Sequence, residues 1–129
     1  MCVDNHVLGL CDELGSLSNL ESLSLANNSI IDLPPSSLTS LSSLTKLSLR
    51  GNKIVEVTSD LIIGLSDLSL SSLLLSSNQI VELPEEIGTL SHLTYLDVSK
   101  NNLTALPEAL GQCGNLEFLA FSENKVFFF

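Results

Sequence analysis

Six asparagines recur along the chain at an almost constant spacing, and this periodicity constrains the fold more than any other feature of the sequence. They are Asn5, Asn28, Asn52, Asn78, Asn101 and Asn124, separated by 23, 24, 26, 23 and 23 residues. The last five end the pattern Leu-x-x-Leu-x-Leu-x-x-Asn, with Val or Phe at the third apolar position of the last two copies. Leucine fills 29 of the 129 positions. Repeats of about 20–50 residues are typical of stacked solenoids, so one array of similar coils is predicted.

The Leu-x-Leu step in each repeat predicts a short strand, because side chains alternate between the two faces of a strand. Leu73 and Leu75 therefore face the core, whereas Leu74 faces outward. The strands of successive repeats are expected to pair in parallel. Each asparagine is expected to bond backbone groups of the turn that follows, so that stacked copies form a ladder. The predicted fold is α/β: a right-handed solenoid with a parallel concave sheet.

A second apolar set follows each turn and predicts short helical or 3₁₀ segments on the convex side. Leu83, Ile87 and Leu90 have the spacing of such a segment, and Pro84 precedes it where a missing N–H does no harm; Pro107 holds the same place in the next repeat. A single array over residues 1–129 is expected, with repeats at about 20–43, 44–69, 70–92 and 93–115 and partial repeats at 1–19 and 116–129. Both ends fall inside a repeat, so the array is expected to be truncated.

Composition excludes several classes of function. Five Lys and Arg against fifteen Asp and Glu give a formal charge of −10, which opposes attraction to nucleic acid or anionic lipid. No apolar run is long enough for a membrane span, and the N-terminus lacks the features of a signal peptide, so the cytoplasm is expected. Three cysteines without metal-ligand spacing predict neither a disulfide framework nor a zinc site. Neither His6 nor His92 belongs to a catalytic motif, so neither an enzyme nor a cofactor is predicted.

The outward positions of the strands form the candidate binding face. All five basic residues fall on it, as do three acidic residues, which gives this face a charge of about +2 and the remainder about −12. Tyr95 and Phe118 hold the same outward position in adjacent repeats, about 5 Å apart by sheet spacing, and are candidate anchors. Ser76 is also expected to face outward. The predicted protein contacts are Lys46, Arg50, Lys53, Tyr95, Lys100 and Phe118.

These repeats resemble those of the intracellular leucine-rich-repeat family. The segments Leu83-Pro84-Glu85-Glu86-Ile87-Gly88 and Leu106-Pro107-Glu108-Ala109-Leu110-Gly111 are similar to the 23-residue repeats of Shoc-type Ras-binding scaffolds. Scribble-like polarity proteins and plant Ras-group repeat proteins contain similar sequence motifs. The resemblance implies a non-enzymatic scaffold whose concave sheet holds a small GTPase and a phosphatase subunit in signalling from Ras to a kinase cascade.

Two other functions remain open from the sequence. The array could be the recognition or sensor domain of a receptor or immune protein. It could also be the substrate-recognition arm of a larger enzyme, such as a ubiquitin ligase, a phosphatase or a cyclase, whose chemistry would then lie outside these residues.

Overall fold

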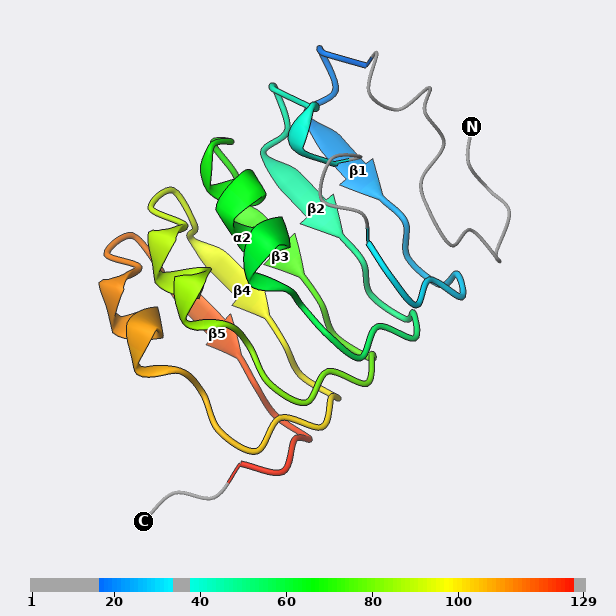
Figure 1. The fold of residues 1–129 in the computed structure, drawn as a ribbon, viewed down its shortest axis with the longest axis vertical. Coiled ribbons are helices and arrows are strands. Elements are labelled where there is room, and N and C mark those ends of the chain that lie inside the picture. Colours follow the sequence, from blue (N-terminus) through cyan, green and yellow to red (C-terminus); the bar gives the residue numbers. More distant parts are fainter. Residues whose placement is uncertain (1–16, 34–37, 127–129) are drawn as a thin grey trace.

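The computed structural model describes residues 17–33 and 38–126, which form a curved stack of coils (Figure 1). Five coils each contribute one three-residue strand: β1 (Ser22–Ser24), β2 (Lys46–Ser48), β3 (Ser72–Leu74), β4 (Tyr95–Asp97) and β5 (Phe118–Ala120). All neighbouring strands pair in parallel, in the order β1-β2-β3-β4-β5. The predicted solenoid with a parallel sheet is confirmed. The predictions for Asn5, His6 and the two chain ends fall outside the described residues.

Each strand occupies the same position within the sequence repeat. Leu23, Leu47, Leu73, Leu96 and Leu119 occupy the middle position of the five strands and pair with one another across the sheet. The three central copies are almost completely buried. Because side chains alternate along a strand, the residues on either side of these leucines stand on the outer, concave face.

Three helical segments that lie wholly within the described residues cover the opposite side of the sheet. They are α2 (Ser59–Ser66), η2 (Glu85–Thr89) and η3 (Glu108–Gln112), and Figure 1 shows them stacked in front of the strands. Pro84 and Pro107 are the N-cap residues of the two 3₁₀ segments, as their spacing predicts. In the 26-residue repeat Thr58 replaces proline, and its hydroxyl oxygen accepts a 3.2 Å hydrogen bond from the backbone N–H of Leu61. The longer repeat and this cap give a full α-helix.

The core lies between the sheet and the helical segments and is built almost entirely from leucine and isoleucine. Leu38, Leu41, Leu44 and Ile62 are fully buried, and they belong to one continuous cluster that runs through all the coils. Each coil therefore depends on its neighbours to bury its apolar face, which is the physical basis of solenoid stability.

The ladder asparagines tie neighbouring coils together. Asn78 is the central example: its Nδ2 group donates to the carbonyl oxygens of Leu49, one coil earlier, and of Leu75, each at 3.0 Å. The corresponding bonds of the other copies are those of Asn52, Asn101 and Asn124. Asn28 donates to the carbonyl oxygens of Leu25 and Ala26 in its own coil. These bonds satisfy carbonyl groups that the turn would otherwise leave without a donor.

The residue before each ladder asparagine from Asn28 to Asn124 has a left-handed backbone. The values of φ are 59° for Asn27, 73° for Gly51, 58° for Ser77, 55° for Lys100 and 55° for Glu123. This conformation turns the chain away from the sheet at the same point in every coil. Side chains at these positions in adjacent coils consequently lie next to one another.

Candidate functional site

The first outward row of the sheet brings a basic residue and two aromatic residues into one line. Lys46, Ser72, Tyr95 and Phe118 are register partners across β2, β3, β4 and β5. Parallel strands lie about 4.8 Å apart, so Lys46 is separated from Tyr95 by one strand that carries only a small serine. The row therefore has a cationic end and an aromatic end.

Tyr95 and Phe118 form a stacked pair. Their ring centroids are 4.3 Å apart and the ring planes differ by 8°. Their exposed fractions are 37% and 47%, respectively. Such a pair presents a flat apolar surface that is held in place before any partner arrives, and exposed aromatic residues of this kind are frequent anchors in protein interfaces.

The coil of β2 presents three basic residues. Lys46, Arg50 and Lys53 are all exposed, and within the described residues none of them forms an ion pair with an acidic group. Lys46 and Arg50 lie on the same side of their coil as Ser48, and Lys53 follows the ladder residue Asn52. These three cations are available to an acidic partner surface.

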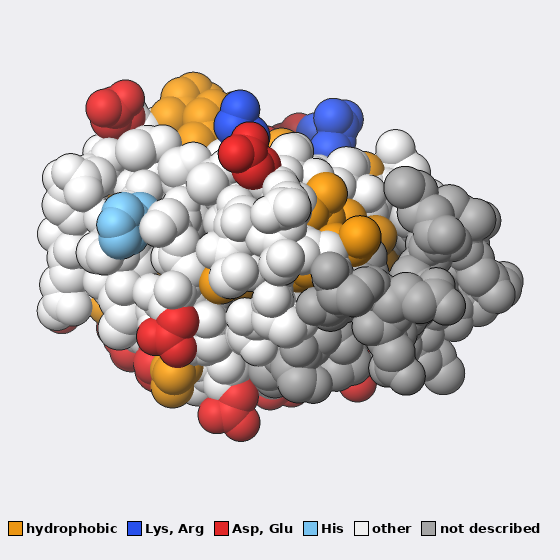
Figure 2. Space-filling view, turned by 90° about the horizontal axis from the view of Figure 1, so that it is seen from above, with side chains coloured by type: hydrophobic (Ala, Val, Ile, Leu, Met, Phe, Trp, Pro, Cys, Tyr) orange, Lys and Arg blue, Asp and Glu red, His pale blue; other side chains and the backbone are white. Residues whose placement is uncertain are grey.

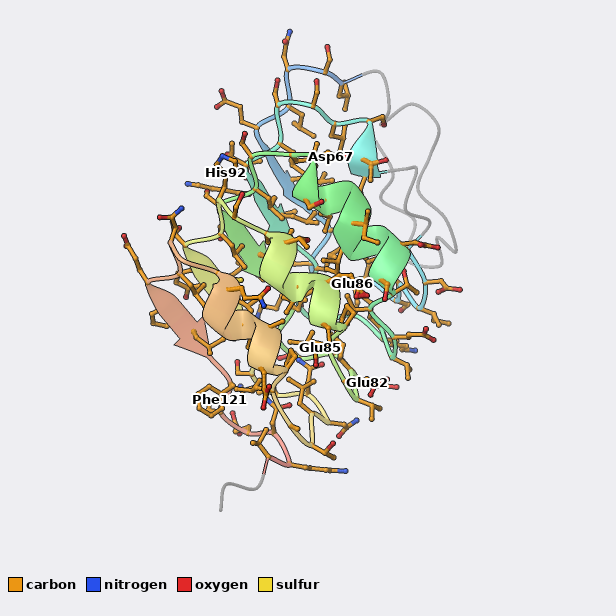
Figure 3. All side chains as sticks on the ribbon, turned by 60° about the vertical axis from the view of Figure 1, so that its left-hand side comes forward. Asp67, Glu82, Glu85, Glu86, His92 and Phe121 are labelled. Atoms are coloured by element: carbon orange, nitrogen blue, oxygen red, sulfur yellow. The ribbon has the colours of Figure 1, made fainter. Side chains whose placement is uncertain are left out.

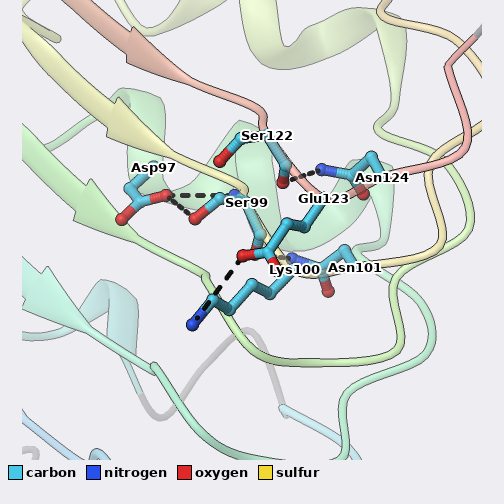
Figure 4. Close-up of polar contacts among 7 residues, drawn as sticks. All are labelled: Asp97, Ser99, Lys100, Asn101, Ser122, Glu123 and Asn124. Carbon is cyan, nitrogen blue, oxygen red and sulfur yellow. Dashed lines mark hydrogen bonds and ion pairs between the residues drawn. The ribbon is translucent and has the colours of Figure 1, made fainter.

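Lys100 is placed differently from the other predicted contacts. Its Nζ atom lies 3.8 Å from Oε2 of Glu123 in the next coil (Figure 4). Both side chains are more than half exposed, so the pair contributes little to folding stability, but it offsets the charge of Lys100. This pair was not predicted. The sequence did carry a signal for it, because both residues directly precede a ladder asparagine in adjacent repeats.

Asp97 makes a local turn contact on the same face. Its Oδ1 atom accepts hydrogen bonds from the backbone N–H of Ser99 at 3.0 Å and from its hydroxyl group at 2.7 Å (Figure 4). The carboxylate thus helps to hold the chain where β4 ends, four residues before Asn101. Ser76, which was expected to face outward with Ser99 and Arg50, is only 5% exposed. A position on the outward row of the sheet is therefore not always accessible to a partner, and Ser76 offers little surface for contact.

The charge of the molecule is only partly sorted by face. In Figure 2 the visible Lys and Arg groups lie along one edge, whereas Asp and Glu groups lie both beside them and along the opposite edge. The concave face therefore carries basic residues among acidic ones. Its strongest basic feature is the coil of β2.

The described residues hold no cluster of three or more His, Cys, Asp or Glu side chains placed to bind a metal ion. His92 is exposed, and its ring contacts the hydroxyl group of Ser91 at 3.5 Å. Cys113 is a buried free thiol that donates to the carbonyl oxygen of Ile87 at 3.3 Å, and burial raises the pKa of this thiol above its ordinary value. Nor does any helix in the described ranges have the length and apolar character needed to cross a membrane.

Comparisons with known proteins agree with this geometry. The family model described as leucine rich repeat matches residues 3–54 and 68–126. A leucine-rich-repeat protein of Leptospira interrogans is 36% identical to the chain, with a TM-score of 0.79, over 89% of this chain and 28% of that one. An internalin of Listeria monocytogenes is 29% identical, with a TM-score of 0.71, over 87% of this chain and 31% of that one. The chain thus spans less than a third of either relative. No curated protein sequence matches it.

Proposed function

Because the chain belongs to the leucine-rich-repeat family, we propose that it is a non-enzymatic scaffold that presents the concave face of its sheet to protein partners. The observation that carries this proposal is the stacked and exposed pair of Tyr95 and Phe118, in register with Lys46. A rigid aromatic surface costs little conformational entropy when a partner covers it. Parallel strands fix its position relative to the basic residues.

In the proposed mechanism, the protein acts only by binding partners to one rigid, curved surface. A partner with an apolar side chain beside acidic groups would cover the aromatic pair and meet Lys46, Arg50 and Lys53 along the neighbouring coil. Charge complementarity of this kind raises the rate of association and selects the partner's orientation. Two partners that bind the same arc would react with each other at a raised effective concentration, with no chemistry supplied by the scaffold.

The finer proposal concerns the identity of the partners. The sequence motif Leu-Pro-Glu-Glu-Ile-Gly, which begins at Leu83, resembles the repeats of Shoc-type scaffolds. This resemblance supports a cytoplasmic scaffold that holds a small GTPase and a phosphatase subunit in signalling from Ras to a kinase cascade. The GTPase would supply the acidic surface for the coil of β2. Lys100, which is paired with Glu123, completes the proposed contact set.

The experiment compares four proteins immobilised at equal density. They are the wild type, the charge-reversal variant Lys46→Glu/Arg50→Glu, the aromatic variant Tyr95→Ala/Phe118→Ala, and the convex-side control Ile63→Ala. The probes are a Ras-type GTPase, loaded with GDP or with a non-hydrolysable GTP analogue, and the catalytic subunit of protein phosphatase-1. We expect the charge-reversal variant and the aromatic variant each to bind the GTPase at least tenfold more weakly than the wild type does. The Ile63→Ala control should bind it as tightly as the wild type.

Two outcomes would count against the proposal at different levels. If neither probe binds the wild type, the partner identities are wrong. Quantitative capture of proteins from a cell lysate then tests the scaffold itself, and recovery that is the same for the wild type and both concave-face variants rejects the concave site.

A further inference from the structure

A second exposed surface lies on the flank of the solenoid, where the chain leaves the ladder turns and runs towards the convex segments. Ile31, Val55 and Val81 are exposed there, although each directly follows a buried isoleucine of the core. The backbone N–H of Val81 donates to the carbonyl oxygen of Val55 at 3.4 Å, so these two segments run side by side. Large β-branched side chains thus form an apolar row along successive coils. Aligned exposure of this kind marks interaction surfaces more often than isolated exposed residues do.

Acidic residues accompany this apolar row. Each of its three members is followed directly by an exposed acid: Asp32, Glu56 and Glu82, respectively. Two further acids, Glu85 and Glu86, begin η2. Figure 3 shows Glu82, Glu85 and Glu86 close together on one flank, whereas Asp67 lies apart from them, at the other end of α2.

The two rows meet in an open hollow of about 600 Å³ between the coils of β2 and β3. Its lining includes Val55 and Val81 together with Glu56, Glu82, Glu85 and Glu86, and it contains no Lys or Arg. The ion pair found within the described residues joins Lys100 to Glu123 and leaves these glutamates without a basic partner. The hollow therefore combines apolar side chains with four carboxylates.

We propose that this hollow is a docking site for a short basic peptide segment of a partner protein, one that carries aliphatic side chains beside its Lys or Arg residues. Charge complementarity selects this occupant, because every charged residue of the lining is a glutamate and the other lining residues are apolar or carry small hydroxyl groups. The carboxylates are not grouped as a metal site, so the matching cations are those of long side chains, whose aliphatic stems can cover Val55 and Val81. This site is independent of the concave face, where basic residues suit an acidic partner.

The experiment measures the fluorescence anisotropy of labelled octapeptides mixed with the full chain. The main probe alternates Lys with Ile. One control peptide alternates Lys with Ser and lacks apolar side chains, and another alternates Glu with Ile and has the opposite charge. The protein variants are Glu56→Lys/Glu82→Lys and Val55→Ser/Val81→Ser. The matched control for the charge variant is Asp60→Lys/Asp67→Lys, which makes the same change of charge on α2 and its C-cap residue. The matched control for the valine variant is Ile63→Ser. The side chain of Ile63 is 50% exposed, compared with 46% for Val55 and 47% for Val81.

We expect the Lys-Ile peptide to bind the wild type at least fivefold more tightly than either control peptide does. Both hollow variants should lose at least fivefold in affinity, whereas the two α2 controls should stay within twofold. Circular dichroism establishes that each variant is folded, and the substituted side chains are all exposed. The proposal is overturned if the Lys-Ser peptide binds as well as the Lys-Ile peptide, if the Asp60→Lys/Asp67→Lys control loses as much affinity as the hollow variants, or if the wild type binds no peptide. None of these outcomes depends on Tyr95 or Lys46, so the concave-face proposal is tested separately.

Discussion

The side-chain oxygen of Asn78 accepts a 3.1 Å hydrogen bond from the backbone N–H of Ile54, which lies one coil earlier in the solenoid. The same asparagine donates to the carbonyl oxygen of Leu49 in that earlier coil. One buried amide therefore satisfies both a donor and an acceptor of the preceding repeat. This geometry explains why an asparagine recurs at every turn, since a carboxylate could not donate and a hydroxyl group could not span both contacts.

Replacement of Asn78 by alanine should lower the free energy of unfolding by at least about 2 kcal/mol, because it leaves the N–H of Ile54 buried without its acceptor. It also removes one of the two donors to the carbonyl oxygen of Leu49, which keeps its bond from Asn52. Urea unfolding followed by circular dichroism measures the change. Asn115→Ala is the matched control, since it removes an exposed bond to the carbonyl oxygen of Ser91 and should cost less than about 0.5 kcal/mol. Equal losses in the two variants would refute the role of the ladder.

Gly51→Ala should cost about 1–2 kcal/mol of stability, because the backbone of Gly51 is left-handed, with φ at 73°. A Cβ atom at this position would also clash with Oδ1 of Asn27, so that side chain must move. The double variant Asn27→Ala/Gly51→Ala separates the two causes: a loss that remains in this background, relative to Asn27→Ala alone, is backbone strain. Thermal unfolding provides the measurement. No change of stability on Gly51→Ala would mean that the turn tolerates any residue.

The stacked rings of Tyr95 and Phe118 should be energetically coupled in the free protein. A double-mutant cycle built from the two alanine variants is expected to give a coupling of about 0.5–1.5 kcal/mol, near the lower limit because both rings are partly exposed. The cycle for Lys46 and Phe118 is the control. These residues share the same row but are three strands apart, and their coupling should be close to zero. A Tyr95–Phe118 coupling no larger than the control value would show that the contact does not hold the rings together.

Alkaline pH should destabilise the protein through Cys113. Burial raises the pKa of its thiol in the folded state, so the neutral form is favoured there and the thiolate is favoured in the unfolded chain. The stabilisation is therefore fully present below the unfolded pKa of about 8.5 and declines as the pH rises through the folded value. Urea unfolding of the wild type and of Cys113→Ala, both with reductant present, should give a stability difference that shrinks between about pH 8 and pH 10. A difference that stays constant over this range would contradict the prediction.

The sequence was sufficient to predict the framework on which the candidate site stands. The 23-residue period placed Leu47, Leu73 and Leu96 at the centres of buried strands, and Pro84 and Pro107 before the convex segments. These predictions succeed because each rests on local rules: alternation along a strand, and proline where the chain needs no N–H donor. Repetition of the same local rule in successive repeats reinforces the interpretation.

Contacts between side chains of two neighbouring coils were harder to predict from the sequence. The sequence placed Tyr95 beside Phe118 but could not give their nearly parallel planes, and it missed both the Lys100–Glu123 pair and the burial of Ser76. The hollow beside Val55 and Val81 also went unnoticed, because the residues that line it come from two repeats and from the start of two different convex segments.

The amino-acid order alone determined that this chain coils, since one apolar pattern that returns every 23 residues can be buried only by stacking copies of itself. The tertiary structure decided how the outer side chains meet. Strand spacing and the left-handed residue before each ladder asparagine from Asn28 to Asn124 set the distance and angle between residues that lie more than twenty positions apart in the sequence.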